Sequence, residues 1–317
     1  MTSKKLTLGV DLGGTKVAVG LCKGEEIIKK AIFPTQADLG FDAVITSIDS
    51  AIKNVTKDFD KSDIKGVGIG CAGQINSENG DVINSPNLQW KNIPLAKSLR
   101  EKTGYSVKVL NDVRAATLAE LKYGSGKGLE NFCNIFLGTG VGSAFVIHGK
   151  LLHGATNSAG EIGHICLDPE GPLCGCGKKG CLEAYSSGTG MENYVKDQLA
   201  KGRKSIISDM VEGKIDEVKG PIIGKAAEQG DKLALESIER IGAYLGIAIA
   251  NIQTLLSLDA IIFGGGIMAL KKYFWNNLTK QIDKCILPVA KPADGLKLLE
   301  AKYLNDAVII GGAAIFA

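Results

Sequence analysis

The apolar positions of this chain fall into short runs of strand length and longer segments of helical period. Residues 6–10, 17–21 and 64–71 are nearly continuous apolar runs, which is typical of buried strands. Residues 41–57 carry apolar side chains three or four positions apart, so that these side chains share one face of a helix. Buried strands mixed with amphipathic helices predict an α/β fold.

The same two patterns predict the elements of the rest of the chain. Strands are expected at residues 107–110, 258–263 and 296–301, and helices at residues 113–123, 191–201, 221–229, 231–257, 273–285 and 305–316. Residues 72–90 are rich in Asn, Gly, Ser and Pro and are predicted to be a loop. Residues 201–218 are polar and poorly periodic.

The length of 317 residues is natural for two domains, yet no linker rich in Pro or Ser divides the chain. The boundary is therefore expected near Val113, where a predicted strand passes into a helix. We predict a small α/β lobe of residues 1–112 and a large α/β lobe of residues 113–302. The last helix, within residues 303–317, is expected to pack back onto the small lobe.

Two glycine-rich turns each join a pair of predicted strands. Residues 11–16 read DLGGTK and residues 137–142 read LGTGVG, so that Gly13 corresponds to Gly138 at a shift of 138 − 13 = 125 residues. The tip of such a hairpin exposes backbone N–H groups that suit a phosphate. The repeat predicts two α/β lobes facing each other across a cleft, with a polyphosphate held from both sides.

Composition and charge narrow the possible functions. The net charge of +3 is too balanced for a nucleic-acid or membrane surface, and no apolar run approaches the ~20 residues of a membrane helix. The start of the chain has no apolar stretch of signal-peptide type. Eight cysteines without such a signal predict a cytoplasmic protein in a reducing environment.

One histidine and three cysteines have the spacing of a structural zinc site. His164 is followed by Cys174, Cys176 and Cys181, and three thiolates with one imidazole suit a closed tetrahedral site. The alternative is a disulfide or a group of merely buried cysteines. A C-x-C pair is poorly placed to bridge itself, and the histidine supplies a fourth ligand, so the pattern favours zinc.

Several polar residues stand where a ligand would lie. Glu161 and Glu183 flank the cysteine segment, and carboxylates can each accept hydrogen bonds from two hydroxyls of a polyol. Asp112 follows a predicted strand, at the end where open α/β sheets bind ligands, and is our candidate base. An N-cap of the next helix is the alternative role for Asp112, and the two roles are compatible.

Three further positions have two interpretations each. Asp11, beside the first glycine turn, could hold magnesium directly or through water. Asn87 could reach a ligand or serve only as a turn residue. The three glycines at positions 264–266 would let an adenine or ribose approach the backbone, although a tight turn also explains them.

Together these residues resemble the ROK family of sugar kinases and related repressors over nearly the whole chain. The resemblance rests on residues 11–16, 68–87, 111–116, 137–142 and 264–266, and most specifically on 161–164 followed by 174–183. One departure is Ala72, where the family commonly has a proline before the glycine, so the pose of Gly73 against a sugar is less defined.

The resemblance implies a two-lobed actin/hexokinase-like ATPase fold with a hinge, assembled into dimers or tetramers. The residues implied to bind ATP and magnesium are Asp11, Gly13, Gly14, Thr15, Lys16, Gly138, Thr139, Gly140, Gly264, Gly265 and Gly266. Those implied to contact the sugar are Gly73, Asn87, Asn111, Asp112, Glu161, His164 and Glu183. His164 would also bind zinc, through its other ring nitrogen.

Three functions fit this resemblance to different degrees. The first is ATP-dependent phosphorylation of a hexose at its 6-hydroxyl, with Asp112 taking the proton, glucose as the first choice and an N-acetylhexosamine or fructose as the alternatives. A repressor would carry a helix-turn-helix ahead of the first glycine turn, and only ten residues precede Asp11. An assembly-forming ATPase of the actin type leaves the zinc segment unexplained. The sequence therefore predicts a hexose kinase.

Overall fold

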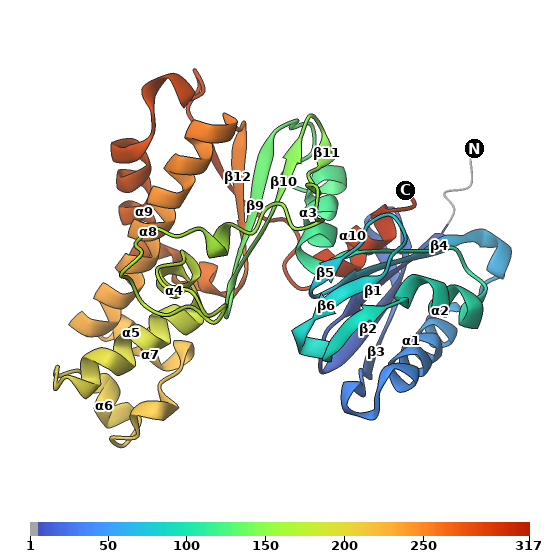
Figure 1. Ribbon diagram of the computed structural model, residues 1–317, viewed down its shortest axis with the longest axis horizontal. Coiled ribbons are helices and arrows are strands. Elements are labelled where there is room, and N and C mark those ends of the chain that lie inside the picture. Colours follow the sequence, from blue (N-terminus) through green and yellow to red (C-terminus); the bar gives the residue numbers. More distant parts are fainter. Residues whose placement is uncertain (1–5) are drawn as a thin grey trace. The chain divides into compact units, whose positions relative to one another are not determined.

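The computed structural model describes residues 6–317, which form two compact units (Figure 1). Of these residues, unit 1 comprises 6–132, Ala144–Gly160 and Glu300–Ala317, and unit 2 comprises Cys133–Ser143 and Glu161–Leu299. Strands and helices alternate in both, so the predicted α/β class is confirmed. The lobe boundary near Val113 remains a prediction. By internal contacts, the helix at that position belongs to unit 1.

The first sheet has the strand order β3-β2-β1-β4-β8. Its strands are β1 (Leu6–Leu12), β2 (Lys16–Lys23), β3 (Glu26–Pro34), β4 (Ile64–Cys71) and β8 (Val107–Asn111). β1, β2 and β3 are antiparallel neighbours, whereas β1, β4 and β8 run parallel. The carboxyl ends of the three parallel strands therefore meet at one edge, which is where ligands bind in such sheets.

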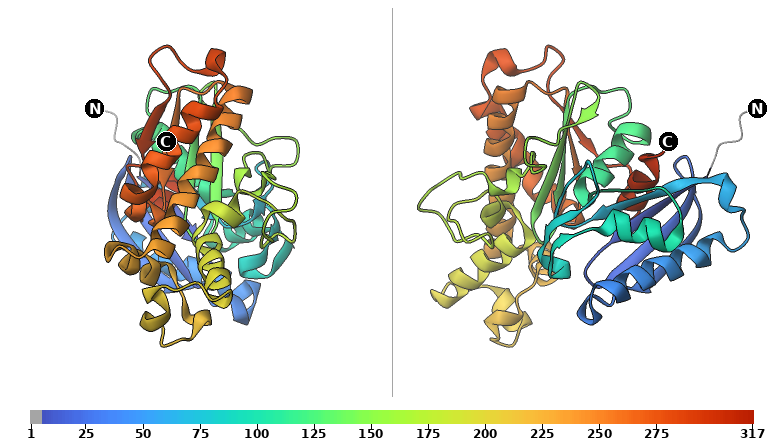
Figure 2. Two further views of the ribbon diagram at one scale, coloured as in Figure 1. Left: turned by 90° about the vertical axis from the view of Figure 1, so that its left-hand side faces the viewer. Right: turned by 45° about the vertical axis from the view of Figure 1, so that its right-hand side comes forward.

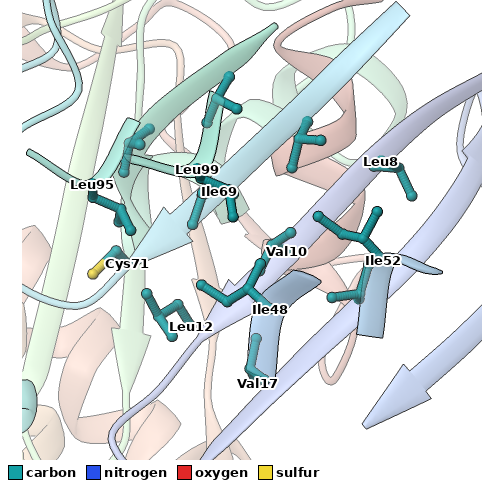
Figure 3. Close-up of a cluster of buried hydrophobic side chains, with 14 of the residues drawn as sticks. Leu8, Val10, Leu12, Val17, Ile48, Ile52, Ile69, Cys71, Leu95 and Leu99 are labelled. Atoms are coloured by element: carbon teal, nitrogen blue, oxygen red, sulfur yellow. The ribbon is translucent and has the colours of Figure 1, made fainter. Parts of the chain in front are cut away.

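Helices α1 (Phe41–Thr56) and α2 (Leu95–Thr103) cover one face of this sheet (Figure 1). Alternation along β1 points Leu8 and Val10 to that face, where both are fully buried. Figure 3 shows these side chains meeting Ile48, from α1, in one apolar cluster. The remaining labelled members of the cluster are Leu12, Val17, Ile52, Ile69, Cys71, Leu95 and Leu99.

The opposite face of the sheet has almost no side chains where helix α10 (Ala307–Ala314) crosses it. A Cβ atom at Gly9 of β1 would overlap the carbonyl oxygen of Ile309, and one at Gly68 of β4 would overlap that of Gly312. α10 also packs against α3 (Asp112–Tyr123), where a Cβ at Gly311 would overlap the carbonyl oxygen of Ala115. Backbone therefore lies directly against backbone at three places.

The predicted loop at residues 72–90 is wrong in part. It contains β5 (Gln74–Ile75) and β6 (Val82–Ser85), which join β7 (Trp90–Ile93) in a small antiparallel sheet. Apolar residues of these short strands, such as Val82, are buried, and their runs are too short for a periodicity window to detect. The edge strand β3 was not predicted because apolar and polar residues do not alternate along it: Ile28 and Ile32 are exposed, whereas Lys29 is on the less exposed face.

The second sheet has the order β11-β10-β9-β12-β13. Its strands are β9 (Phe132–Leu137), β10 (Val141–Ile147), β11 (Lys150–Leu151), β12 (Ala260–Gly264) and β13 (Lys297–Glu300). Both predicted glycine turns thus join adjacent strands, β1 to β2 and β9 to β10. No helix in residues 6–317 has the length and apolar character needed to cross a membrane.

Apart from its strands, unit 2 consists mainly of helices. Its helices are α4 (Glu183–Ser186), α5 (Gly188–Ala200), α6 (Ile206–Met210), α7 (Gly220–Glu228), α8 (Lys232–Leu256) and α9 (Lys271–Cys285). α8 and α9 lie side by side (Figure 2). Gly242 and Gly246 of α8 make this contact close, because Cβ atoms there would meet the carbonyl oxygens of Phe274 and Leu278.

We predict that Gly68→Ala lowers the unfolding midpoint, because its new methyl group would overlap the backbone of α10. Overpacking of this kind costs on the order of 1–3 kcal/mol, or more where backbone cannot move. Gly224→Ala on α7 is the control, since its Cβ would meet only the flexible end of Leu270 at 3.3 Å. Chemical denaturation of both variants checks this, and a wild-type midpoint for Gly68→Ala would contradict the described contact.

Candidate active site

The first glycine turn, between β1 and β2, is closed by its own backbone. The N–H of Gly13 donates to the carbonyl of Lys16 at 3.1 Å, and the Thr35 hydroxyl donates to the carbonyl of Gly13 at 2.7 Å. A Cβ at Gly14 would lie 2.6 Å from the carbonyl oxygen of Asn87. Glycine at position 14 therefore lets the segment carrying Asn87 pack against the turn. Asn87 is exposed and lies in a single 3₁₀ turn, Pro86–Leu88.

Two acidic side chains gather at the carboxyl edge of the first sheet. Asp11 lies near the end of β1, and Asp112 begins α3 directly after β8. Burial, and then the charge of Asp112, raise the pKa of Asp11 to about 6, while Lys16 opposes this shift. Burial also raises the pKa of Asp112, against hydrogen bonds that favour the ionised form. Carboxylates with raised pKa values are common at functional sites.

Asn111 positions the Asp112 carboxylate. Its side-chain amide donates to Asp112 Oδ1 at 2.8 Å and to the carbonyl of Gly73 at 3.2 Å. The N–H of Val113 donates to the same Asp112 oxygen at 2.9 Å. These bonds connect three of the predicted sugar-contact residues, Gly73, Asn111 and Asp112.

The alternative role of Asp112 as a helix cap is wrong. The N-cap of α3 is Asn111, whose side-chain oxygen accepts the N–H of Arg114 at 3.2 Å. Asn and Asp cap helices about equally well, so the sequence alone could not choose between the two neighbours. Asp112 is instead the first residue of α3, and its Oδ1 accepts the Val113 N–H of the first helical turn.

A buried arginine, not anticipated from the sequence, ties another loop to this corner. Arg114 is only 4 % exposed. Its guanidinium donates to the carbonyls of Asn157 and Ala159, each at 2.9 Å, and to that of His153 at 3.4 Å. Asn157 in turn accepts a hydrogen bond from the Ser77 hydroxyl at 2.5 Å. The only feature of the sequence that could have indicated this role was a positively charged residue among the mostly apolar residues at the start of the helix.

In unit 2, the second glycine turn lies against the first turn of α5. The N–H of Gly188 donates to the carbonyl of Gly138 at 2.8 Å, and that of Thr189 donates to Thr139 at 3.2 Å. The predicted helix began at Met191, but α5 begins earlier, behind the N-cap Ser187. The partial positive charge of this helix start adds to the suitability of the turn for an anion.

A cavity of about 500 Å³ opens beside this turn, within unit 2. Gly138 and Thr139 line it, together with apolar Met191, Ile267 and Leu270. Of the three predicted nucleoside-contact glycines, Gly266 lines this cavity. Gly265 has a φ of 92° and packs against the backbone of Leu137, while Gly264 ends β12. A tight turn therefore explains Gly264 and Gly265, whereas a contact with a ligand remains the interpretation for Gly266.

The predicted metal ligands converge. One donor atom from each of His164, Cys174, Cys176 and Cys181 lies within 4.8 Å of all the others. Cys176 Sγ and Cys181 Sγ are 3.6 Å apart, and Cys174 Sγ lies 3.8 Å from His164 Nδ1. Ligands at tetrahedral Zn–S and Zn–N distances are separated by about 3.6–3.8 Å, so the donor set fits zinc. None of these cysteines forms a disulfide.

The two glutamates beside the cysteines differ in surroundings. Glu183 begins α4, and its carboxylate accepts the N–H of Val141 at 3.0 Å and the thiol of Cys174 at 3.5 Å. Glu183 thus joins the cysteine cluster to the second glycine turn. Glu161 is exposed and precedes the 3₁₀ turn Ile162–His164. His164 is also exposed, with Nδ1 directed at the cluster, so Nε2 is the nitrogen left for another partner.

The chain is similar to characterised sugar kinases. It is 35 % identical to a glucokinase of Halalkalibacterium halodurans, covering 98 % of this chain and 94 % of that protein. A glucokinase of Thermotoga maritima is 34 % identical, covering 97 % of this chain and 96 % of that protein.

Solved structures give the same result for the fold. A ROK family glucokinase from Streptomyces griseus, in complex with glucose and AMPPNP, matches with a TM-score of 0.80 and 30 % identity over 98 % of both chains. A ROK family transcriptional regulator, a homologue of the E. coli MLC protein, matches with a TM-score of 0.85 and 29 % identity over 98 % of this chain but 77 % of its own. The ROK family profile matches residues 7–317, and this chain therefore belongs to the ROK family.

Proposed function

We propose that this protein transfers the γ-phosphoryl group of ATP to the 6-hydroxyl of a hexose, with glucose as the preferred substrate. The observation that carries the proposal is Asp112, a half-buried carboxylate held by Asn111 at the carboxyl edge of the parallel strands. The two glucokinases that share about a third of its residues support the same activity. The glucokinase structure with glucose and AMPPNP supports ATP as the donor.

Asp112 acts as the general base in this proposal. Its carboxylate accepts a hydrogen bond from the 6-hydroxyl and takes the proton as that oxygen bonds to phosphorus. Burial raises the pKa of Asp112, which makes the carboxylate a better proton acceptor. The amide of Asn111 fixes one carboxylate oxygen, which orients the other toward the substrate.

The two glycine turns bind the phosphates. Backbone N–H groups of Gly14 and Thr15 serve one side, with Lys16 adding positive charge, and those of Thr139 and Gly140 serve the other. Gly13 and Gly138 close the two turns with their own N–H groups. Asp11 would hold magnesium, which neutralises charge on the phosphates when it is bound. Phosphoryl transfer passes through a loose transition state, so positioning and charge neutralisation contribute most of the rate. The apolar cavity beside Thr139 takes the nucleoside, with Gly266 on its wall.

His164, Cys174, Cys176 and Cys181 would hold a zinc ion with no open coordination position. Such an ion has a structural role and orders the segment that carries the sugar ligands. Glu161, Glu183 and His164 Nε2 contact ring hydroxyls, and Gly73, Asn87 and Asn111 complete the sugar site. The free cysteines suit a cytoplasmic protein, and we expect a dimer or tetramer by analogy with the family.

Glucose satisfies this set of polar groups best. Its β form presents the hydroxyls at positions 1 to 4 equatorially, so a carboxylate can accept from two neighbours. An axial hydroxyl would leave a buried partner without its hydrogen bond, at a cost of ~1–3 kcal/mol. An N-acetylhexosamine differs from glucose at position 2, and fructose differs from it in ring form. Measured kcat/KM values decide between these alternatives and glucose.

The preferred sugar is tested with a panel of glucose, mannose, fructose and the two N-acetylhexosamines derived from glucose and mannose. We expect glucose to have the highest kcat/KM at one fixed ATP concentration, by roughly 5- to 150-fold over a sugar that loses one buried hydrogen bond. A lead of tenfold or more for an N-acetylhexosamine would reassign the substrate and leave the kinase mechanism in place.

Replacing the base should abolish turnover without removing the fold. We expect Asp112→Asn to lower kcat by at least ~10²–10⁴, the usual contribution of a positioned proton acceptor. The matched control is Asp49→Asn, which alters another buried carboxylate of unit 1, on α1 and paired with Lys53. A near-wild-type kcat for Asp112→Asn would reduce Asp112 to a structural role.

The same variant, Asp112→Asn, should lower turnover but increase the stability of the fold. Because burial raises the pKa of Asp112 in the folded state, its ionised form destabilises the fold at pH values above that pKa. Asp112→Asn should therefore unfold at a higher denaturant concentration than wild type at pH 7–8. The gain should fade as the pH falls toward about 4, the ordinary pKa of an aspartate.

The metal is tested by Cys176→Ser, which removes one thiolate ligand. We expect metal analysis to find one zinc per wild-type chain, and the variant to lose both the zinc and its glucose phosphorylation. Cys285→Ser, which changes an exposed cysteine at the end of α9, should retain both. Full activity in protein free of zinc would disprove the structural role.

A further inference from the structure

A fifth cysteine lies opposite one of the predicted zinc ligands. Cys166 and Cys181 are partners in an isolated antiparallel β-bridge. The N–H of Leu167 donates to the carbonyl of Gly180 at 2.8 Å, and that of Leu182 donates to Ile165 at 3.0 Å. These bonds flank the cysteine pair on both sides. Cys166 and Cys181 are therefore a non-hydrogen-bonded cross-strand pair, the type in which opposite side chains lie closest.

The spacing of such a pair matches that of a disulfide. Directly opposed residues of this type have Cα atoms about 4.5 Å apart and side chains on the same face. Disulfides form at Cα separations of about 4.4–6.8 Å. A bond between the two sulfurs therefore needs a change of side-chain rotamer and little or no movement of the backbone.

The two thiols differ in access and in their other role. Cys166 is exposed, whereas Cys181 is 1 % exposed. Cys181 belongs to the group of four convergent donors, and Cys166 is outside that group. An oxidant from solvent thus reaches Cys166 directly, and Cys181 is the thiol that lies opposite it.

We propose that Cys166 is an oxidation site that forms a reversible disulfide with Cys181, and that this disulfide and zinc binding exclude each other. The Cys181 sulfur can serve as a zinc-binding thiolate or as half of a disulfide, but not as both. Oxidation therefore leaves three of the four ligands, too few for a closed structural site.

The chemistry requires a peroxide and balances as a two-electron oxidation. The Cys166 thiolate attacks one peroxide oxygen, the O–O bond breaks, and a sulfenic acid forms while the departing hydroxide takes a proton from solvent to become water. The Cys181 thiolate then attacks the Cys166 sulfur, the S–S bond forms, and hydroxide leaves and is protonated to a second water. A dithiol reverses the reaction by thiol–disulfide exchange.

The functional consequence rests on the proposed kinase activity. Cys181 is followed by Leu182 and Glu183, and Glu183 contacts both Cys174 and the second glycine turn. Oxidation would free the cysteine segment from its metal and disorder the surroundings of Glu183. Sugar phosphorylation should then stop under peroxide and return after reduction with added zinc.

The test uses the zinc-loaded full chain treated with hydrogen peroxide, with zinc release followed by a chromogenic chelator. We expect one zinc released and two thiols lost per chain, and a cross-linked peptide pair containing Cys166 and Cys181 that is lighter by two hydrogen atoms. Cys166→Ser should keep its zinc at the same dose, and the control Cys285→Ser should behave as wild type. Dithiothreitol with zinc should restore the starting state.

Several outcomes would overturn the proposal. Equal zinc release from Cys166→Ser would do so, as would a disulfide within the set Cys174, Cys176 and Cys181 in place of the Cys166–Cys181 bond. The mass and zinc readouts do not depend on catalysis. A protein that forms this disulfide but phosphorylates no sugar would refute the proposed function alone, and a glucose kinase whose Cys166 stays reduced would refute the oxidation site alone.

Discussion

Contact of backbone with backbone across one face of the first sheet is the constraint on which the corner of the active site depends. Gly9, Gly68 and Gly311 lack the one atom that would hold α10 away from β1, β4 and α3. Because α10 packs so closely, the sheet and α3 have a fixed separation. Asp11 and Asp112 are carried by these elements, so their proximity follows from the absence of side chains at these glycines.

The site concentrates groups that are costly to bury. Burial makes both Asp11 and Asp112 harder to ionise, and the charge of Asp112 adds to this effect at Asp11. The Arg114 guanidinium, nearby in the chain, is almost fully buried. Arg114 is accommodated because three carbonyl groups of one loop converge on it. Such arrangements add little to stability, but they fix side chains and loops in one geometry, which is what a phosphoryl-transfer site requires.

The sequence predicted the parts whose cause is local. Patterns within single short segments predict the strands around both glycine turns and the helix after Asn111. The same is true of the convergence of His164 with its cysteines. The sequence did not predict β5–β7, because strands of two to four residues are too short to show a clear periodicity. Nor could it reveal that Arg114 holds the loop at Asn157, or that Cys166 lies opposite Cys181, since these contacts depend on tertiary structure.

The division of the chain into units has a consequence for its synthesis on the ribosome. Unit 1 is built from residues 6–132, a central segment and Glu300–Ala317, whereas unit 2 is almost one continuous stretch. During translation from the N-terminus, the first sheet emerges early but lacks the helix that covers its glycine face until α10 (Ala307–Ala314) has been made, after all of unit 2. Unit 2 can complete its fold while unit 1 waits with that face uncovered. The nascent chain therefore carries an incomplete sheet for most of its elongation, which makes this interval the period in which chaperones matter most to it.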